Sequence, residues 1–306
     1  MKILRLRFLK QGALVSLLFA LTFAGGCSSS FSSLGSSVGN LGGWFGQDNK
    51  EYQDPESVEA AEKLYLDADR LLSNGSYPEA AKKFEDVDRL HPYSPYARRA
   101  IVMAAYSNYK GGKYTEAIAG GKRYSTLHPG TKESALAQHV IAMSHYDQIA
   151  DPKRDQKRTK KALASLETLV RRYPNSRYSS EARNRIRIAR DVLAAADMNV
   201  GRYYLNRKNY LAAINRFKSV VKNYQTTRHV EEALARMAEA YMALGIASEA
   251  QTAGAILGHN FPNSPWYKDT YALLQSGGLQ PRENNGSWIS KTWKSAVNTA
   301  KKLNPI

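Results

Sequence analysis

The stretch NGSYPEAAKKFEDVDRLHP, residues 74–92, contains the pattern that decides the fold. A Gly-containing turn is followed by the small residue Ala80, by the apolar residues Phe84 and Val87, and by Pro92 at the end. Apolar residues at this spacing share one face of an α-helix, and proline cannot continue the helical hydrogen-bond ladder. The stretch therefore predicts a turn, an amphipathic helix and a defined helix end.

The same pattern recurs four more times along the chain. It occupies residues 111–129, 159–174, 207–224 and 244–262, and the anchor alanines are Ala80, Ala117, Ala162, Ala213 and Ala250. Their separations of 37, 45, 51 and 37 residues fit the tetratricopeptide repeat of roughly 34 residues, with insertions. We predict an all-α fold, a tetratricopeptide-repeat α-solenoid of about five helix-turn-helix repeats over residues 55–275. The extra length falls in a basic insertion, 150–161, and in a long helix from about residue 181 to 206.

The first 27 residues are typical of an exported lipoprotein. A basic start precedes an apolar run at residues 12–23, which is too short to span a bilayer. Cys27 is the single cysteine, and the small residues before it resemble the bacterial lipobox, in which the thiol receives diacylglycerol. We expect residues 1–26 to be a signal peptide, Cys27 to be the lipidated mature terminus and residues 27–54 to be a Ser/Gly-rich tether. The alternative is a chance cysteine beside an ordinary cleavage site.

The chain is strongly basic, with a formal net charge of +17 that becomes +13 when the four basic residues of the signal peptide are removed. Such a charge favours acidic partners, anionic lipid or nucleic acid, and the export signal argues against nucleic acid. Basic residues are densest over residues 153–190, a stretch that contains thirteen Lys and Arg and only three acids. Such a basic run is usually a solvated surface. The alternative is that it binds an acidic partner or lipid headgroups.

Signatures of catalysis are weak. The six histidines are scattered, and GGK at residues 111–113 lacks the rest of a phosphate-binding loop. His139 and His145 are six residues apart and so lie on different faces of a helix. We therefore expect no enzyme activity, no metal site and no cofactor.

Several longer strings resemble the BamD family, lipoproteins of the β-barrel assembly machinery of the bacterial outer membrane. They are HPYSPY at residues 91–96, YDQIADPKRDQKRTKKAL at 146–163, LVRRYPNSRYSSEA at 169–182 and YYLNRKNYLAAINRF at 203–217. The resemblance covers about residues 56–275. It implies a lipid-anchored protein on the periplasmic face of the outer membrane. Such a protein binds nascent outer-membrane proteins by aromatic-ended segments and docks, with other lipoproteins, on the barrel-forming central subunit (BamA).

The resemblance also implies residues for docking. Arg216 in AAINRF matches a family arginine that pairs with the central subunit, and Arg207 matches another. Two other functions stay open: a repeat lipoprotein that organises peptidoglycan or division proteins, and an envelope hydrolase, for which no catalytic cluster is evident.

A groove for an extended peptide is expected where the first helices of the repeats line one face. Counting from the small anchor residues places four tyrosines on or near that face: Tyr65, Tyr106, Tyr109 and Tyr146. A tyrosine offers ring area together with a hydrogen-bonding hydroxyl. The alternative for each ring is packing between helices.

The last segment, residues 276–306, reads as a linker followed by a basic amphipathic helix. Ser287 can cap this helix, and apolar residues recur every three or four positions at Ile289, Trp293, Val297 and Ala300. The helix can dock on the last repeat as a cap, or it can reach a membrane interface with its tryptophans and lysines.

Overall fold

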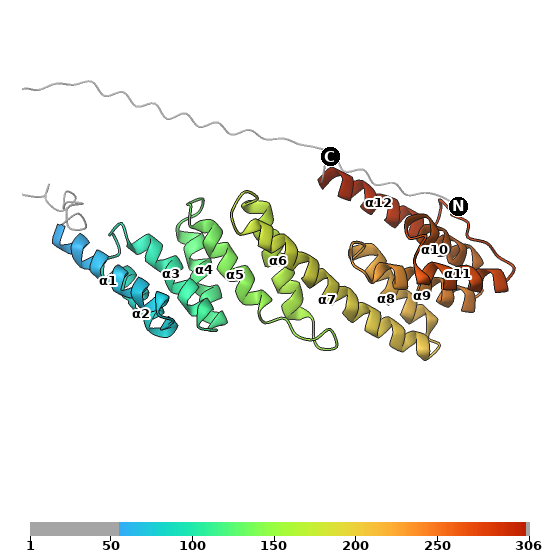
Figure 1. Cartoon of the computed structure of the whole chain (residues 1–306), viewed down its shortest axis with the longest axis horizontal. Helices are drawn as coiled ribbons and strands as arrows, with labels where there is room; N and C mark the ends of the chain where they lie inside the picture. The colour runs from blue at the N-terminus through green and yellow to red at the C-terminus, as the bar shows by residue number, and fades with distance from the viewer. Residues whose placement is uncertain (1–54, 304–306) are drawn as a thin grey trace, which may run out of the picture. The chain divides into compact units, whose positions relative to one another are not determined.

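A computed structural model of the chain describes the backbone of residues 55–303 and the side chains as far as residue 295. Over this range the chain forms twelve α-helices and no strand (Figure 1). They are α1 (Pro55–Ser73), α2 (Tyr77–Leu90), α3 (Ala97–Lys110), α4 (Tyr114–Leu127), α5 (Ser134–Tyr146), α6 (Lys157–Arg172), α7 (Ser179–Asn206), α8 (Tyr210–Asn223), α9 (Val230–Ala243), α10 (Ala247–Asn260), α11 (Pro265–Ser276) and α12 (Trp288–Leu303). The expectations for the signal peptide, Cys27 and the tether lie outside the described residues.

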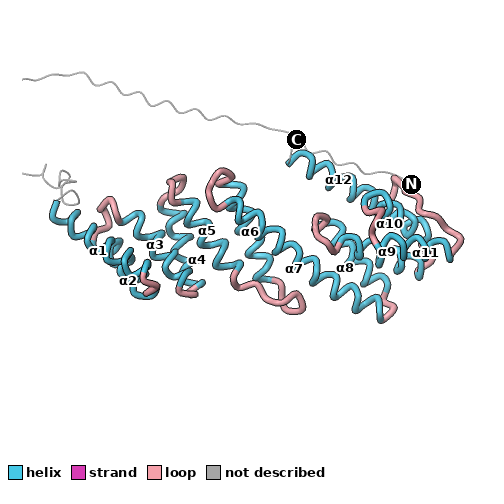
Figure 2. Tube along the Cα trace, in the orientation of Figure 1, coloured by secondary structure: helices cyan, strands magenta, loops and turns pink. Residues whose placement is uncertain are grey.

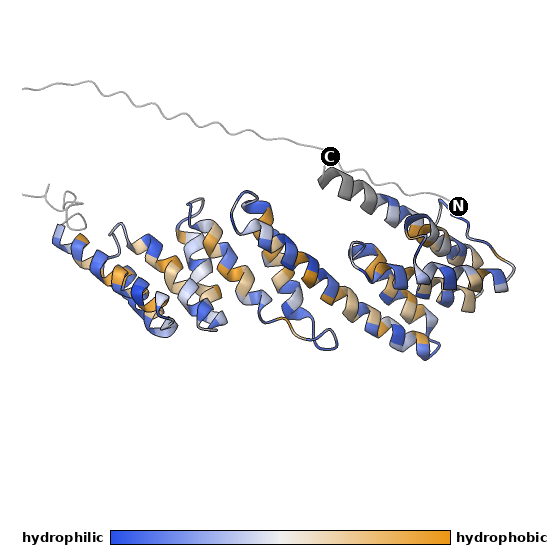
Figure 3. Ribbon diagram, viewed as in Figure 1, coloured by the Kyte–Doolittle hydropathy of each residue, from blue (hydrophilic) through white to orange (hydrophobic). Residues whose placement is uncertain are grey.

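The helices form five consecutive pairs, α1–α2 to α9–α10, followed by α11 and α12. From α1 to α10, each helix packs chiefly on its neighbours in sequence, as in a repeat solenoid. Figure 3 shows hydrophobic and hydrophilic residues interleaved along the helices, as helices with one buried face require. The all-α tetratricopeptide-type fold predicted from the repeats is confirmed.

Small residues at the predicted anchor positions let the paired helices approach closely. All five anchor alanines are fully buried: Ala80, Ala117, Ala162, Ala213 and Ala250. In four of the pairs, the residue five positions before the anchor alanine has a left-handed backbone. In three of them this residue is a glycine, with φ of 82° at Gly75, 74° at Gly112 and 75° at Gly245. Glycine adopts that conformation without strain. In the fourth pair Lys208 takes the same place with φ of 59°, which strains this turn.

The second helix of most pairs ends just before a proline. Helices α2, α4, α6 and α10 end two residues before Pro92, Pro129, Pro174 and Pro262. Helix α8 ends at Asn223, where Gln225 replaces the proline. The insertion between α5 and α6 is a loop, visible in Figure 2.

The tail docks along α10 instead of standing apart. The Gln251 carboxamide of α10 donates to the carbonyl oxygen of Gln280 at 2.8 Å, and the Asn284 backbone amide donates to Thr252 Oγ1 at 3.2 Å. Ser287 caps α12 as predicted, because its Oγ accepts from the Ile289 amide at 3.0 Å. These bonds hold the segment between α11 and α12 against α10.

Helix α12 begins as a packed element. Ile289 is fully buried, and the Trp288 indole donates to the Tyr241 hydroxyl at 3.0 Å. Lys218 Nζ lies 4.5 Å from the centre of the Trp288 ring, a cation–π contact. The helix packs on α8 and α10, so its first turns cover the second helices of the last two pairs. Val297 and Ala300 lie beyond the described side chains.

None of the helices described combines the length and the apolar character of a membrane span.

Candidate functional site

An aromatic groove lies between the first helices of three consecutive pairs. It has a volume of about 660 Å³ and is lined by α3, by α5 with the turn before it, and by the turn before α7. Tyr106, His139 and Tyr178 supply its rings, and Arg99, Lys132 and Arg177 supply positive charge. The His139 and Tyr178 rings are stacked at 4.4 Å with an angle of 19° between their planes. The groove thus offers a flat aromatic wall beside cationic groups.

The electrostatics of this groove favour an anionic or carboxylate-bearing ligand. The Arg177 guanidinium lies 4.9 Å from the centre of the Tyr178 ring and donates to its hydroxyl at 2.7 Å. Burial lowers the pKa of His139, which favours the neutral imidazole that stacks on Tyr178. Glu133 is the one carboxylate among the lining residues, and it accepts from the Tyr124 hydroxyl at 3.2 Å.

The four predicted groove tyrosines are not gathered at one site. Tyr106 lines the aromatic groove. Tyr65 is only 7% exposed and packs against Phe84 at 5.2 Å between ring centres, so for this residue the packing alternative holds and the groove expectation is wrong. Its hydroxyl is buried without a hydrogen-bond partner among the residues with described side chains, and burial raises its pKa.

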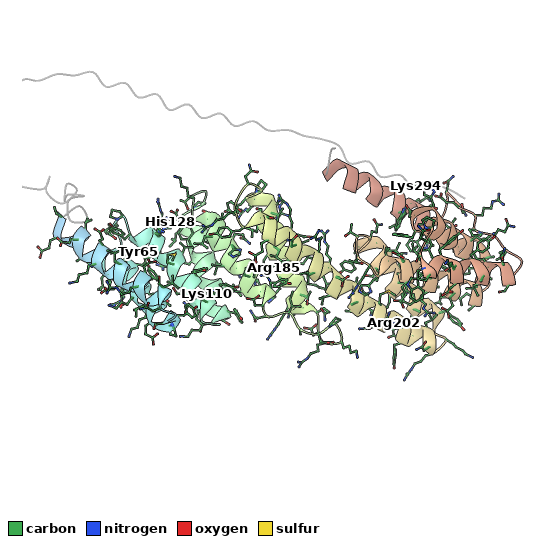
Figure 4. The ribbon with its side chains drawn as sticks, viewed as in Figure 1. Tyr65, Lys110, His128, Arg185, Arg202 and Lys294 are labelled. Carbon is green, nitrogen blue, oxygen red and sulfur yellow. The ribbon has the colours of Figure 1, made fainter. Side chains whose placement is uncertain are left out.

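Tyr109 and Tyr146 lie farther along the first helices. The Tyr109 hydroxyl donates to Asp147 Oδ2 at 2.9 Å, and burial together with this carboxylate raises its pKa. Tyr146 carries the Arg185 guanidinium 4.6 Å above its ring. Tyr65 and Arg185 lie well apart along the row of helices in Figure 4. Both Tyr109 and Tyr146 are half-buried and belong to contacts between repeats.

A second hollow, the insertion groove, lies between the basic insertion and helices α7 and α8. Its volume is about 780 Å³, and residues 152–156 face Asp197, Tyr203 and Arg216 across it. Arg216 is 49% exposed, and its Nη1 lies 3.6 Å from Asp197 Oδ1. Asp197 also accepts from the Ser219 hydroxyl at 2.7 Å.

Arg207 belongs to the same neighbourhood. Its guanidinium lies 4.4 Å from the centre of the Tyr203 ring, and that ring lines the insertion groove. Arg216 therefore lines the insertion groove from α8, and Arg207, in the turn between α7 and α8, contacts one of the rings that line it. Tyr203 is 50% exposed, a large aromatic surface for a partner.

Sequence reasoning missed several residues of both grooves. The sequence gives no sign that His139 is a stacking partner of Tyr178. Tyr178 and Arg177 follow Pro174 in the turn before α7, where the string NSRYSS marks a turn but indicates no function. Within residues 55–295, no three His, Cys, Asp or Glu side chains are grouped to hold a metal ion.

Comparison with known proteins identifies a matching family and several similar proteins. The family YfiO, described as outer membrane lipoprotein, matches residues 58–257. The chain is 44% identical over 220 residues to the outer membrane protein assembly factor BamD of Caulobacter vibrioides, covering 72% of each chain. It is 38% identical over 213 residues to the BamD of Rickettsia prowazekii, covering 70% of this chain and 85% of that protein. The yeast Sti1 TPR2AB-domain complex with pHSP90 aligns over 81% of this chain and 93% of that one, with 14% identity and a TM-score of 0.40.

Proposed function

This chain belongs to the BamD family of outer membrane lipoproteins, and from that membership we propose that it takes part in outer-membrane protein assembly as a non-enzymatic scaffold. The chain is anchored to the periplasmic face of the outer membrane by lipid on Cys27, followed by the tether of residues 27–54. It holds a nascent barrel protein in one groove and docks on the barrel-forming central subunit beside the other. Other lipoproteins of the complex bind elsewhere on the solenoid.

The mechanism is positioning. A client held by one segment is kept near the subunit that inserts it, and the effective concentration there rises without a chemical step. The aromatic groove and the insertion groove share no lining residue, so both can be occupied together. A solenoid whose repeats pack on their neighbours suits such a task, because it separates two binding surfaces on one folded body.

The aromatic groove is the proposed client site, and the observation that carries this is the His139–Tyr178 stack beside Tyr106 and three cations. An aromatic side chain at the end of a client segment can extend the stack, and its terminal carboxylate can pair with Arg99, Lys132 or Arg177. Aromatic stacking adds about 0.5–1.5 kcal/mol to the burial of ring area.

We expect Tyr106→Ala to weaken binding of a peptide with an aromatic carboxy-terminal residue roughly tenfold, a loss of about 1.4 kcal/mol. The matched control is Tyr271→Ala, which removes a partly exposed tyrosine from α11, away from the groove. Fluorescence titration measures both, with the amidated peptide as a test of the carboxylate. Equal affinities for wild type and Tyr106→Ala would remove this groove from the client site.

The second candidate function, an organiser of peptidoglycan or division proteins, would use the same repeat surfaces. Its support is the solenoid architecture alone, which serves many kinds of partner. The family membership favours the assembly role.

A further inference from the structure

The outer face of α6 is the most strongly charged helix face in the described part of the chain. Its six basic residues are all exposed: Lys157, Arg158, Lys160, Lys161, Arg171 and Arg172. None of these side chains forms an ion pair within residues 55–295. The single acid of the helix, Glu167, is turned to α7, where it pairs with Arg190 at 2.7 Å. The outer face therefore carries positive charge with no carboxylate to balance it.

This arrangement works against the stability of the helix itself. Lys157, Lys160 and Lys161 lie in the first turns, where the helix dipole disfavours cations, and no acid occupies the first turn. Lys157 and Lys161 are also four residues apart, a spacing at which like charges repel. Helix α2 differs, because it carries acids among its bases, with Glu79 in its first turn. The charge of α6 is therefore not explained by helix stability.

The positive surface continues onto the neighbouring pair. His145 of α5 has a lowered pKa, first because it is partly buried and then because Lys161 of α6 and Lys122 of α4 lie near it. Lys122 is exposed. The second helices of two neighbouring pairs, α4 and α6, thus present cations on the same side of the molecule. Among the described elements, α6 packs on α5 and α7, and its outer face is left uncovered.

We propose that the outer face of α6 binds the anionic headgroups of a lipid bilayer. The chain belongs to a family of outer membrane lipoproteins, so a membrane surface is close at hand. A helix of 16 residues is about 24 Å long, enough to lie over several headgroups at once. Lys160 also borders the insertion groove, and the six cations are spread along the helix from its first turn to its last, so the face suits a flat charged surface that meets many cations together. Binding there would orient the solenoid relative to the membrane, in addition to any lipid anchor.

The test uses the unlipidated chain from residue 28 to 306, which contains the whole compact unit of residues 49–306. Its sedimentation is measured with vesicles of phosphatidylglycerol and phosphatidylcholine, and with vesicles of phosphatidylcholine alone. The variant Lys157→Gln/Lys160→Gln/Lys161→Gln removes three charges from α6. The matched control, Lys110→Gln/Lys222→Gln/Lys268→Gln, removes three charges from exposed positions on α3, α8 and α11.

We expect wild type to bind the anionic vesicles and not the neutral ones. The α6 variant should bind roughly a hundredfold more weakly, since each basic residue near an anionic surface contributes about one kilocalorie per mole. The control should stay within about threefold of wild type. Raising the salt from about 0.05 M to about 0.5 M should release wild type, because screening shortens the range of the attraction.

Three results would overturn the proposal. Equal weakening of both triple variants would show that net charge alone acts. Binding that is insensitive to the α6 variant and lost in Lys291→Gln/Lys294→Gln would place the lipid contact on the tail helix. Failure of wild type to bind anionic vesicles, together with binding of an acidic polypeptide such as polyglutamate, would make the partner of this face a protein.

Discussion

Phe217→Ala is expected to lower the free energy of unfolding by about 3–5 kcal/mol, the usual cost of emptying the space of a buried phenylalanine. Phe217 is fully buried in the largest core cluster, which joins α7 to α10 and includes Ile289 of α12. Denaturant unfolding followed by circular dichroism measures the loss. The control is Leu211→Ala on the same helix, since Leu211 is 65% exposed and should change stability by less than about 0.5 kcal/mol.

Gly201 of α7 lies against the Phe217 ring and provides a second test of the same contact. A Cβ at Gly201 would lie 2.4 Å from Cε1 of the Phe217 ring, so even alanine cannot be placed there without movement. We expect Gly201→Ala to cost about 1–3 kcal/mol in the wild-type chain and clearly less when Phe217 is already alanine. Equal costs in the two backgrounds would show that the α7–α8 contact is looser than the structure describes.

Cys27→Ser is expected to abolish incorporation of a labelled fatty acid completely. The thiol is the atom that receives diacylglycerol in a lipobox, and the serine hydroxyl does not replace it. The unlipidated protein lacks the acyl chains that make anchoring stable, so it should also leave the membrane fraction at about 0.5 M salt, where the electrostatic contact of α6 is screened. Metabolic labelling and fractionation measure both effects. Equal labelling of wild type and variant, or a mature terminus elsewhere, would overturn the lipid anchor.

The helices were predictable because their signals are local. The anchor alanines, the glycine turns and the prolines each act within a few residues, and the Ser287 cap was predictable for the same reason. The burial of Tyr65 could also have been foreseen. Tyr65 precedes Ala68 by three residues and so shares its face, and Ala68 is fully buried. The expectation of a groove residue overlooked that shared face.

The grooves themselves could not be predicted, because their residues come from separate repeats. Tyr106 and Tyr178 are 72 residues apart in sequence and line one groove. Their proximity depends on how α3, α5 and α7 pack, which periodicity within one helix does not determine. The docking of the tail on α8 and α10 is similar. The contact of Trp288 with Tyr241 and Lys218 joins segments that no local pattern connects.

The central proposal is that this chain docks, beside the insertion groove, on the barrel-forming subunit of the assembly complex. Affinity purification of the lipidated protein from solubilised envelopes, with mass spectrometry of what accompanies it, tests this most directly. The barrel subunit should co-purify with wild type. It should also co-purify with the control Lys222→Glu, which changes an exposed residue of α8, the helix that carries Arg216. Arg216→Glu should retain roughly a tenth or less, because an unpaired charge is left in the contact. Undiminished recovery with Arg216→Glu would remove Arg216 from the interface, and recovery of peptidoglycan or division proteins without a barrel subunit would contradict the account.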